Sequence, residues 1–164
     1  MLKKIFITAV IVFLSAGYGD ESNSDRQILS GKLPKNLDRT DGLAGIDENR
    51  NGIRDDIEKY IVENYHDEGQ KKALFQFAKT MQGILLADIS DKTAIKKIDM
   101  QDSRAMHCIF LQFNEKKGTE NPSVAWKKIR SLTTNTKSRL KAYLNFNKAL
   151  DGTVATLPRG DTCE

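Results

Sequence analysis

Between residues 67 and 86, apolar side chains recur every three or four positions, a spacing that places them along one face of an α-helix. The members of this stripe are Leu74, Phe77, Ala78, Met81, Ile84 and Leu85. Asp67 stands where a helix N-cap is expected, and Gln70 three residues later completes a capping-box pattern. A helix with one apolar face must bury that face against another element, so the rest of the chain has to supply its partners.

Three other segments carry helical periodicity, at residues 55–65, 90–117 and 121–152. Gly118 is a stop signal after the second of them, and Pro122 suits the first turn of the third. The residues expected to face inward are Ile57, Tyr60, Ile61, Ile95, Ile98, Ala105, Cys108, Ile109, Phe113, Val124, Ile129, Leu132, Leu140, Tyr143, Leu144 and Leu150. Since no segment alternates as a half-buried strand would, the sequence predicts an all-α fold, a small helical bundle.

The first residues have the layout of a secretory signal peptide. Lys3 and Lys4 precede an apolar run over 5–14, and the small residues at 15–17 follow it. A membrane-spanning helix needs about 20 apolar residues, roughly twice the length of this run. We therefore expect residues 1–17 to be a signal peptide, 18–40 a flexible polar tether, and 41–164 the folded domain with its calcium-type loop.

The stretch "FLSAGYGDESNS" resembles a bacterial lipoprotein signal, except that Tyr18 stands where the lipidated cysteine would be. Without that thiol, we expect a soluble exported protein, periplasmic or extracellular. Association with a membrane is expected only if the chain carries a lipid anchor near residue 18.

Export also changes how charge is interpreted. The formal charge is +4, and removal of Lys3 and Lys4 with the signal leaves 24 basic and 22 acidic residues. The lysine pairs of the remaining chain are scattered among acidic residues, which is typical of solvated helix faces. The sequence therefore gives no support for nucleic-acid binding.

Cys108 and Cys163 are the two cysteines of the chain, and an oxidising compartment favours a disulfide between them. This bridge would connect the segment "LPRGDTCE" to the body of the domain. The alternative is that Cys108 is a small buried residue and Cys163 a free thiol, which an oxidising environment disfavours.

The segment "GIDENRNGIRDDIEKYI", residues 45–61, crowds oxygen-bearing side chains around Gly52. Calcium takes about six to eight oxygen ligands, which a twelve-residue loop can supply from alternate positions. Counted from the first aspartate, the ligand positions hold Asp47, Asn49, Asn51, Ile53 (through its carbonyl), Asp55 (directly or through water) and Glu58. The alternative is an Asx-rich turn followed by the acidic first turn of a helix.

This segment resembles the EF-hand calcium loop, and more closely its variants in dockerin modules and thrombospondin type 3 repeats. It is also similar to the "GIDxNxNGIRDDIE" segment of uncharacterised bacterial envelope proteins. Arg54 occupies the eighth position, where EF-hands place an aliphatic residue that pairs with a second loop, and the sequence contains no second loop. The resemblance implies a lone Ca²⁺ loop that leads into one helix.

Two classes of function follow from these observations. The first is a non-catalytic exported calcium-binding protein that interacts with another protein at the bacterial cell envelope, for instance as an immunity or inhibitor protein. The second is a periplasmic hydrolase whose site combines residues distant in sequence, such as His66, His107 and a carboxylate.

Overall fold

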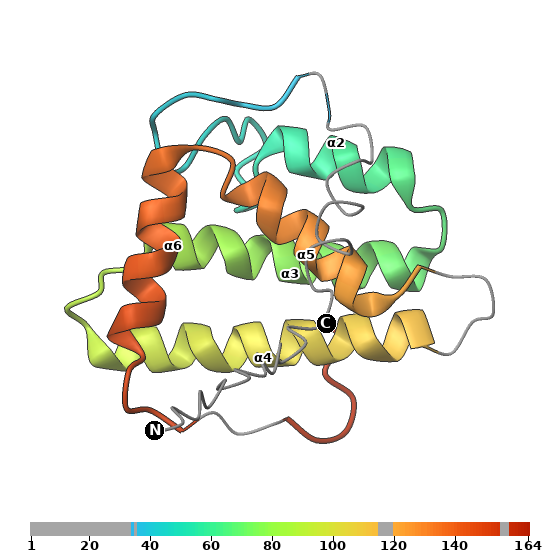
Figure 1. Ribbon diagram of the computed structural model, residues 1–164. Coiled ribbons are helices and arrows are strands. Elements are labelled where there is room, and N and C mark those ends of the chain that lie inside the picture. The colour runs from blue at the N-terminus through green and yellow to red at the C-terminus, as the bar shows by residue number, and fades with distance from the viewer. Residues whose placement is uncertain (1–33, 35, 115–119, 155–157) are drawn as a thin grey trace, which may run out of the picture.

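The computed structural model describes residues 34, 36–114, 120–154 and 158–164, and its regular elements in these ranges are helices without any strand (Figure 1). They are α2 (Asp55–Asn64), α3 (Glu68–Leu86), α4 (Lys92–Asn114), α5 (Pro122–Thr133) and α6 (Lys137–Ala149). The predicted all-α bundle is confirmed. The predicted signal peptide, most of the tether and residues 115–119 lie outside the described residues.

The helices begin where the sequence places capping residues. The Asp67 side chain accepts a hydrogen bond from the Gln70 backbone N–H at 3.1 Å, ahead of α3. Asn121 Oδ1 accepts from the Ser123 N–H at 2.8 Å, and Pro122 is the first residue of α5. These caps satisfy N–H groups that have no partner inside their own helix.

The centre of the bundle is the packing of α3 against α4, which run alongside each other with α5 and α6 crossing over them (Figure 1). The apolar face of α3 is buried as its periodicity predicts. Members of the common core include Ile57, Ile61, Leu74, Phe77, Met81, Ile84, Ile95, Ile109, Phe113, Ile129, Leu132 and Phe146.

The expected single helix over residues 121–152 is wrong, because the chain breaks it between Thr133 and Lys137. The hydroxyl of Thr134 bonds to the Arg130 carbonyl at 2.9 Å, and the Thr136 side chain caps the new helix by accepting from the Arg139 N–H at 3.3 Å. Threonine and asparagine side chains compete in this way with the helical backbone, which is why four of them in succession end α5.

The break also changes which face of α6 is buried. Leu140 and Leu144, expected to face inward, are 45% and 56% exposed, whereas Phe146 and Arg139 are buried. A helix that starts anew after a turn does not keep the rotational phase of the preceding one. The apolar pattern of α5 could therefore not be extended across the turn.

The predicted disulfide is present, with the Cα atoms of Cys108 and Cys163 5.0 Å apart. It joins the segment 158–164 to α4. Next to it, Thr162 is fully buried, and its carbonyl accepts a hydrogen bond from Gln76 Nε2 on α3 at 3.0 Å. This C-terminal segment is therefore held by both central helices.

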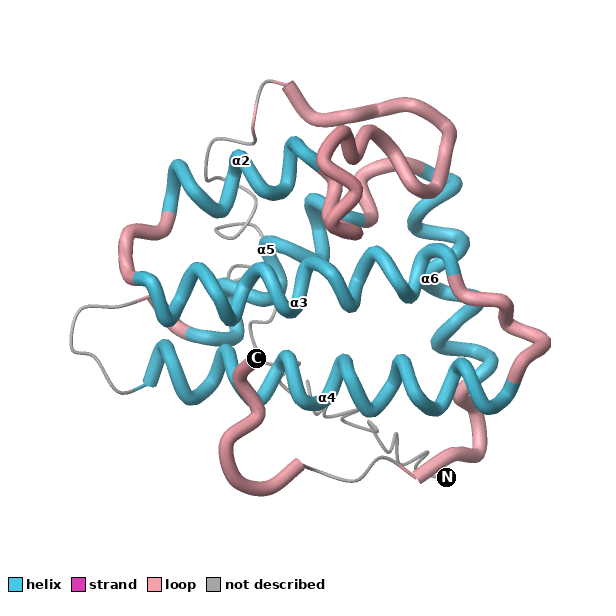
Figure 2. The backbone as a smooth tube through the Cα atoms, turned by 180° about the vertical axis from the view of Figure 1, so that it is seen from behind, coloured by secondary structure: helices cyan, strands magenta, loops and turns pink. Residues whose placement is uncertain are grey.

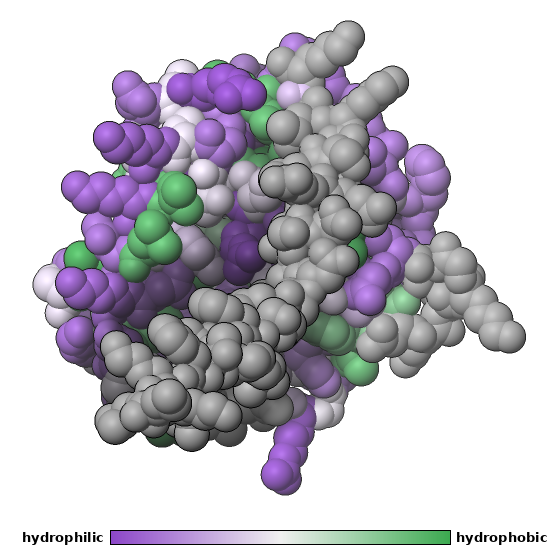
Figure 3. All heavy atoms as spheres, in the orientation of Figure 1, coloured by the Kyte–Doolittle hydropathy of each residue, from purple (hydrophilic) through white to green (hydrophobic). Residues whose placement is uncertain are grey.

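The described helices include none that combines the length and apolar character needed to cross a bilayer. On the face drawn in Figure 3, outside the grey atoms, hydrophilic residues predominate and hydrophobic ones form small separate groups. This view agrees with the solvated helix faces that the distribution of lysines predicts.

Candidate metal centre

The segment before α2 folds into a compact loop, visible from behind beside the start of that helix (Figure 2). The carboxylate of Asp47 accepts hydrogen bonds from the N–H groups of Asn51 at 3.2 Å and Gly52 at 2.9 Å. Arg50 and Gly52 have positive φ angles of 56° and 86°, which reverse the chain direction around this carboxylate. The glycine at the sixth position thus makes the sharp turn that the sequence predicted for it.

The side chains of Asn49 and Asn51 meet the carboxylate of Glu58, which lies one turn into α2. Asn49 Nδ2 donates to Glu58 Oε2 at 3.1 Å, and Asn51 Nδ2 donates to Glu58 Oε1. The oxygens of the two amides accept from backbone N–H groups, Asn49 Oδ1 from Asn51 at 3.0 Å and Asn51 Oδ1 from Ile53 at 2.9 Å. The structure therefore gathers four of the predicted ligand residues around one point of the loop.

The other two predicted ligands have different neighbours. Asp55 accepts a hydrogen bond from the Glu48 N–H at 3.2 Å, and its own N–H donates to the Ile46 carbonyl at 2.9 Å, so it holds the loop to the start of α2. The side chain of Ile53 is buried in the core, which fixes the backbone carbonyl predicted as a ligand.

Within the described ranges, no three His, Cys, Asp or Glu side chains are arranged to hold a metal ion. The loop differs from such a cluster because its donor set mixes the carboxylates of Asp47 and Glu58 with two asparagine amides and a backbone carbonyl. All of these donors are oxygens and none is a nitrogen or sulfur ligand. A set of this chemistry suits a hard cation such as Ca²⁺ and does not suit Zn²⁺.

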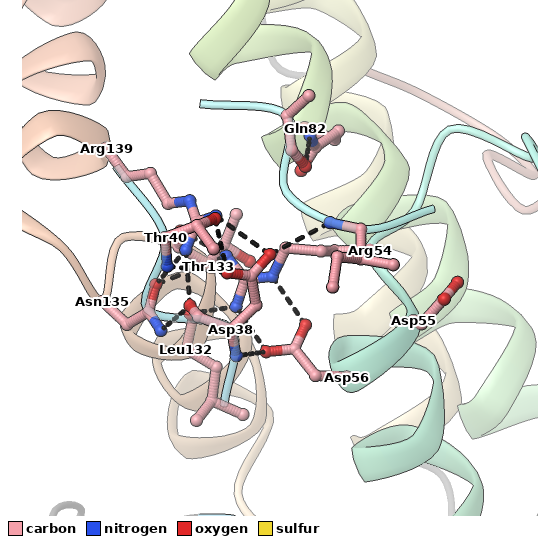
Figure 4. Close-up of polar contacts among 12 residues, drawn as sticks. Asp38, Thr40, Arg54, Asp55, Asp56, Gln82, Leu132, Thr133, Asn135 and Arg139 are labelled. Atoms are coloured by element: carbon pink, nitrogen blue, oxygen red, sulfur yellow. Dashed lines mark hydrogen bonds and ion pairs between the residues drawn. The ribbon is translucent and has the colours of Figure 1, made fainter. Parts of the chain in front are cut away.

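On its inner side, the loop is attached to the bundle through Arg54 (Figure 4). The Arg54 side chain is fully buried, and it forms a bidentate pair with Asp56 at 2.6 and 2.8 Å. It also donates to the Leu132 carbonyl at 3.1 Å and to Asn135 Oδ1 at 3.3 Å, at the turn between α5 and α6. EF-hands place an aliphatic residue at this position. In this chain an arginine is suitable there because its partners lie in the bundle.

A second buried arginine completes this network of charges. Arg139 Nη2 lies 3.3 Å from Asp38 Oδ2, and Arg139 Nη1 donates to the Asp38 carbonyl at 2.6 Å and to Asn135 Oδ1 at 2.9 Å. The Asp38 N–H donates to Asp56 at 2.8 Å, which links the two arginine pairs. Two positive and two negative charges are therefore buried together, which offsets the cost of removing each from water.

This network acts on the pKa values of its members. Burial alone would raise the pKa of Asp38. Hydrogen bonds from Thr40 and Ile46 and the charge of Arg139 outweigh this effect and lower the pKa to about 2. Burial, together with the charge of Arg54, lowers the pKa of Arg139. Leu37 packs against the core. Thus Leu37 and Asp38, which the sequence assigned to the flexible tether, contact the folded domain.

The two histidines have different neighbours. His66 lines a pocket of about 370 Å³ beside Tyr65 and Glu120, and His107 is not among its lining residues. His107 Nδ1 instead lies 3.1 Å from Thr162 Oγ1, beside the disulfide. In the pocket at His66, the Tyr65 hydroxyl donates to Glu120 at 2.9 Å, and burial raises the pKa of Tyr65, so this phenol stays protonated at neutral pH. The geometry therefore adds no support for a hydrolase built on both histidines.

Comparison of the chain with models of known protein families, with curated proteins and with solved structures found no match.

Proposed function

We propose that this chain is a non-catalytic exported protein that binds Ca²⁺ in the loop at residues 47–58 and that interacts with another protein at the bacterial cell envelope. The observation that carries the calcium part is the convergence of Asn49 and Asn51 on the Glu58 carboxylate, across nine and seven residues of sequence. The Asp47 carboxylate organises the same turn through the N–H groups of Asn51 and Gly52.

The amide groups of the two asparagines explain how such a loop could exist with and without an ion. An asparagine side chain carries two N–H donors and one carbonyl acceptor at the same end. The N–H groups of Asn49 and Asn51 face Glu58 and satisfy its negative charge. If each amide rotated, its oxygen would point toward a Ca²⁺ ion bound beside Glu58. The ion would then take the place of the two hydrogen bonds from Asn49 and Asn51 to Glu58.

We expect the affinity of this loop to be modest. The predicted set has three carboxylates, Asp47, Asp55 and Glu58, and the adjacent Arg50 carries a positive charge. Arg54, also adjacent in sequence, is neutralised by Asp56 inside the bundle. A dissociation constant on the order of 10⁻⁴ to 10⁻³ M is typical of calcium sites in extracellular modules. At Ca²⁺ ten times this constant, binding would stabilise the fold by about 1.4 kcal/mol.

The test is a calorimetric titration of the domain with Ca²⁺ and separately with Mg²⁺, combined with thermal melting. We expect saturable heat and a higher Tm with Ca²⁺, and a weaker response to Mg²⁺, which prefers a rigid octahedral shell. The Asp47→Ala variant should lose both effects of Ca²⁺.

Glu48→Ala is the matched control, since it removes a carboxylate from the same loop at a position that is not a predicted ligand. It should keep the Ca²⁺ response. A wild-type Tm that is the same with Ca²⁺ and with a chelator would contradict the calcium proposal.

The protein partner needs its own experiment. The immobilised domain, with Ca²⁺ and with chelator, should capture a protein from an extract of the cell envelope of the source organism, and Asp47→Ala should reduce the capture if the loop shapes the contact. Equal recovery by the domain and by an unrelated helical protein would refute the interaction.

A further inference from the structure

The C-terminal segment 158–164 is recognised by α3 and α4 through specific contacts in addition to the disulfide. Gln76 on α3 contacts its backbone twice: Nε2 donates to the Thr162 carbonyl at 3.0 Å, and Oε1 accepts from the Glu164 N–H at 3.3 Å. His107 on α4 lies 3.1 Å from the Thr162 hydroxyl. The segment is therefore held by two helices, with Cys163 covalently joined to Cys108.

This attachment brings Glu164 to the candidate calcium loop. A pocket of about 410 Å³ is lined by Asn51, Ile53 and Glu58 on one side and by residues of α3 and Glu164 on the other. Asn51 and Glu58 are predicted ligands, so the pocket opens onto the loop. Two residues more than 100 positions apart in sequence, Glu58 and Glu164, thus line one shallow surface pocket.

The charges that line this pocket make the C-terminal segment relevant to cation binding in the loop. Lys72 and Lys79 of α3 line the same pocket as Glu58 and Glu164. Lys79 also lies close to the turn, since a Cβ added at Gly52 would be 3.6 Å from its Cε. Positive charge next to a cation site weakens binding, and the carboxylate of Glu164 offsets part of it. Loss of Glu164 from the pocket leaves the two lysines facing the loop.

We propose that the Cys108–Cys163 disulfide controls the calcium loop, because it fixes Glu164 beside it. This inference rests on the proposed calcium function. In the redox step, an external dithiol transfers two electrons and two protons to the disulfide, which becomes two thiols, and the dithiol becomes a disulfide. Without the bridge, the contacts of Gln76 and His107 hold the segment less firmly. Its carboxylate then spends less time in the pocket, and the affinity of the loop for Ca²⁺ falls.

The expected change is about two- to fivefold in the dissociation constant, the range for one unit charge acting over roughly 8 Å near a solvent-exposed site. Because Glu164, Lys72 and Lys79 are exposed, the change should shrink at high salt. Binding linkage is reciprocal, so Ca²⁺ should also stabilise the oxidised form. A threefold coupling corresponds to a midpoint potential lower by about 14 mV.

The experiment measures the Ca²⁺ dissociation constant by calorimetry for the oxidised domain, the dithiol-reduced domain and Glu164→Gln. Glu164→Gln removes the charge and keeps the disulfide, so it tests the mechanism even if reduction loosens the fold. Both altered forms should bind two- to fivefold more weakly than the oxidised domain. Asp151→Asn, an equal change of charge on an exposed residue outside this pocket, should bind as the wild type does. Equilibration with a dithiol buffer, with and without Ca²⁺, gives the midpoint potential independently.

The outcomes separate this inference from the proposed function. Equal dissociation constants for the oxidised domain, the reduced domain and Glu164→Gln would overturn the redox control and leave calcium binding intact. Absence of binding heat in every form would refute the calcium function itself, and the redox control with it.

Discussion

Gly45, two residues before the loop, lies directly against the buried charges. Its φ of 69° lies in the left-handed region that favours glycine. A Cβ at this position would be 2.6 Å from Asp38 Oδ2 and 2.9 Å from Arg139 Nη2, and it would overlap the Arg54 side chain. The backbone therefore passes directly over the two arginines, and no side chain fits between.

We predict that Gly45→Ala lowers the free energy of unfolding by about 2–4 kcal/mol, because it combines an unfavourable φ with displacement of buried charged groups. Gly42→Ala is the matched control, since a Cβ there meets nothing within 4 Å. It should change stability by less than about 1 kcal/mol. Urea unfolding of both variants measures the difference, and similar losses would mean that the contacts at Gly45 are not the cause.

At the scale of elements, the turn between α5 and α6 joins parts of the chain that are distant in sequence. Asn135 is its centre: its Nδ2 donates to the Asp38 carbonyl at 2.8 Å, and its Oδ1 accepts from Arg54 and Arg139. The turn thus connects the segment before the loop, the start of α2 and the start of α6. Orientation of α6 depends on this one side chain as well as on apolar packing.

We predict that Asn135→Ala lowers the free energy of unfolding by about 2–3 kcal/mol, since it removes one acceptor from each of two buried arginines and the amide donor to the Asp38 carbonyl. Asn145→Ala, on the exposed face of α6, removes the same group where it has no such role and should be neutral or slightly stabilising. Denaturant titration of the two variants tests this. Equal stability would show that water replaces the Asn135 contacts.

At the scale of the whole molecule, the pH dependence of stability reflects two aspartates whose pKa values shift in opposite directions. Asp38 has its pKa lowered to about 2, so its stabilising contribution is present above its ordinary value of 3.8 and is lost as pH falls toward 2. For Asp102 on α4, burial and the charge of Asp99 raise the pKa to about 6, while Arg130 lowers it in part. Its protonated form is favoured by folding, so its contribution is present below 3.8 and lost as pH rises through 6.

We predict that Asp102→Asn stabilises the protein at pH 7.5 by about 1–3 kcal/mol, because the variant removes a buried charge without changing the shape of the side chain. Asp102 Oδ1 has no hydrogen-bond partner among the described residues, so the substitution breaks no hydrogen bond at this oxygen. At pH 4 the variant and the wild type should be nearly equal. Unfolding free energies measured from pH 4 to 8 test this, and a constant difference across the range would contradict a raised pKa.

The bundle could be predicted from sequence because its stripes and caps are local signals, as Asp67, Asn121 and the α3 face demonstrate. The sharp turn at Gly52 was also predictable, since a glycine at a fixed place in a loop pattern is a local signal, whereas the ligand roles of the loop residues stay a prediction. The roles of Arg54, Arg139 and Glu164 were not predictable, because their partners lie 78, 101 and 88 residues away. Nothing in the neighbouring residues of a charged side chain indicates which distant backbone it will meet.

The separation of 101 residues between Arg139 and Asp38 has a consequence for biogenesis. Residue 38 can acquire this partner only after residue 139 has been synthesised, so 101 further residues must be made before the pair can form. Throughout that interval, the segment before the loop lacks the arginine of α6 to which it is bonded in the finished fold.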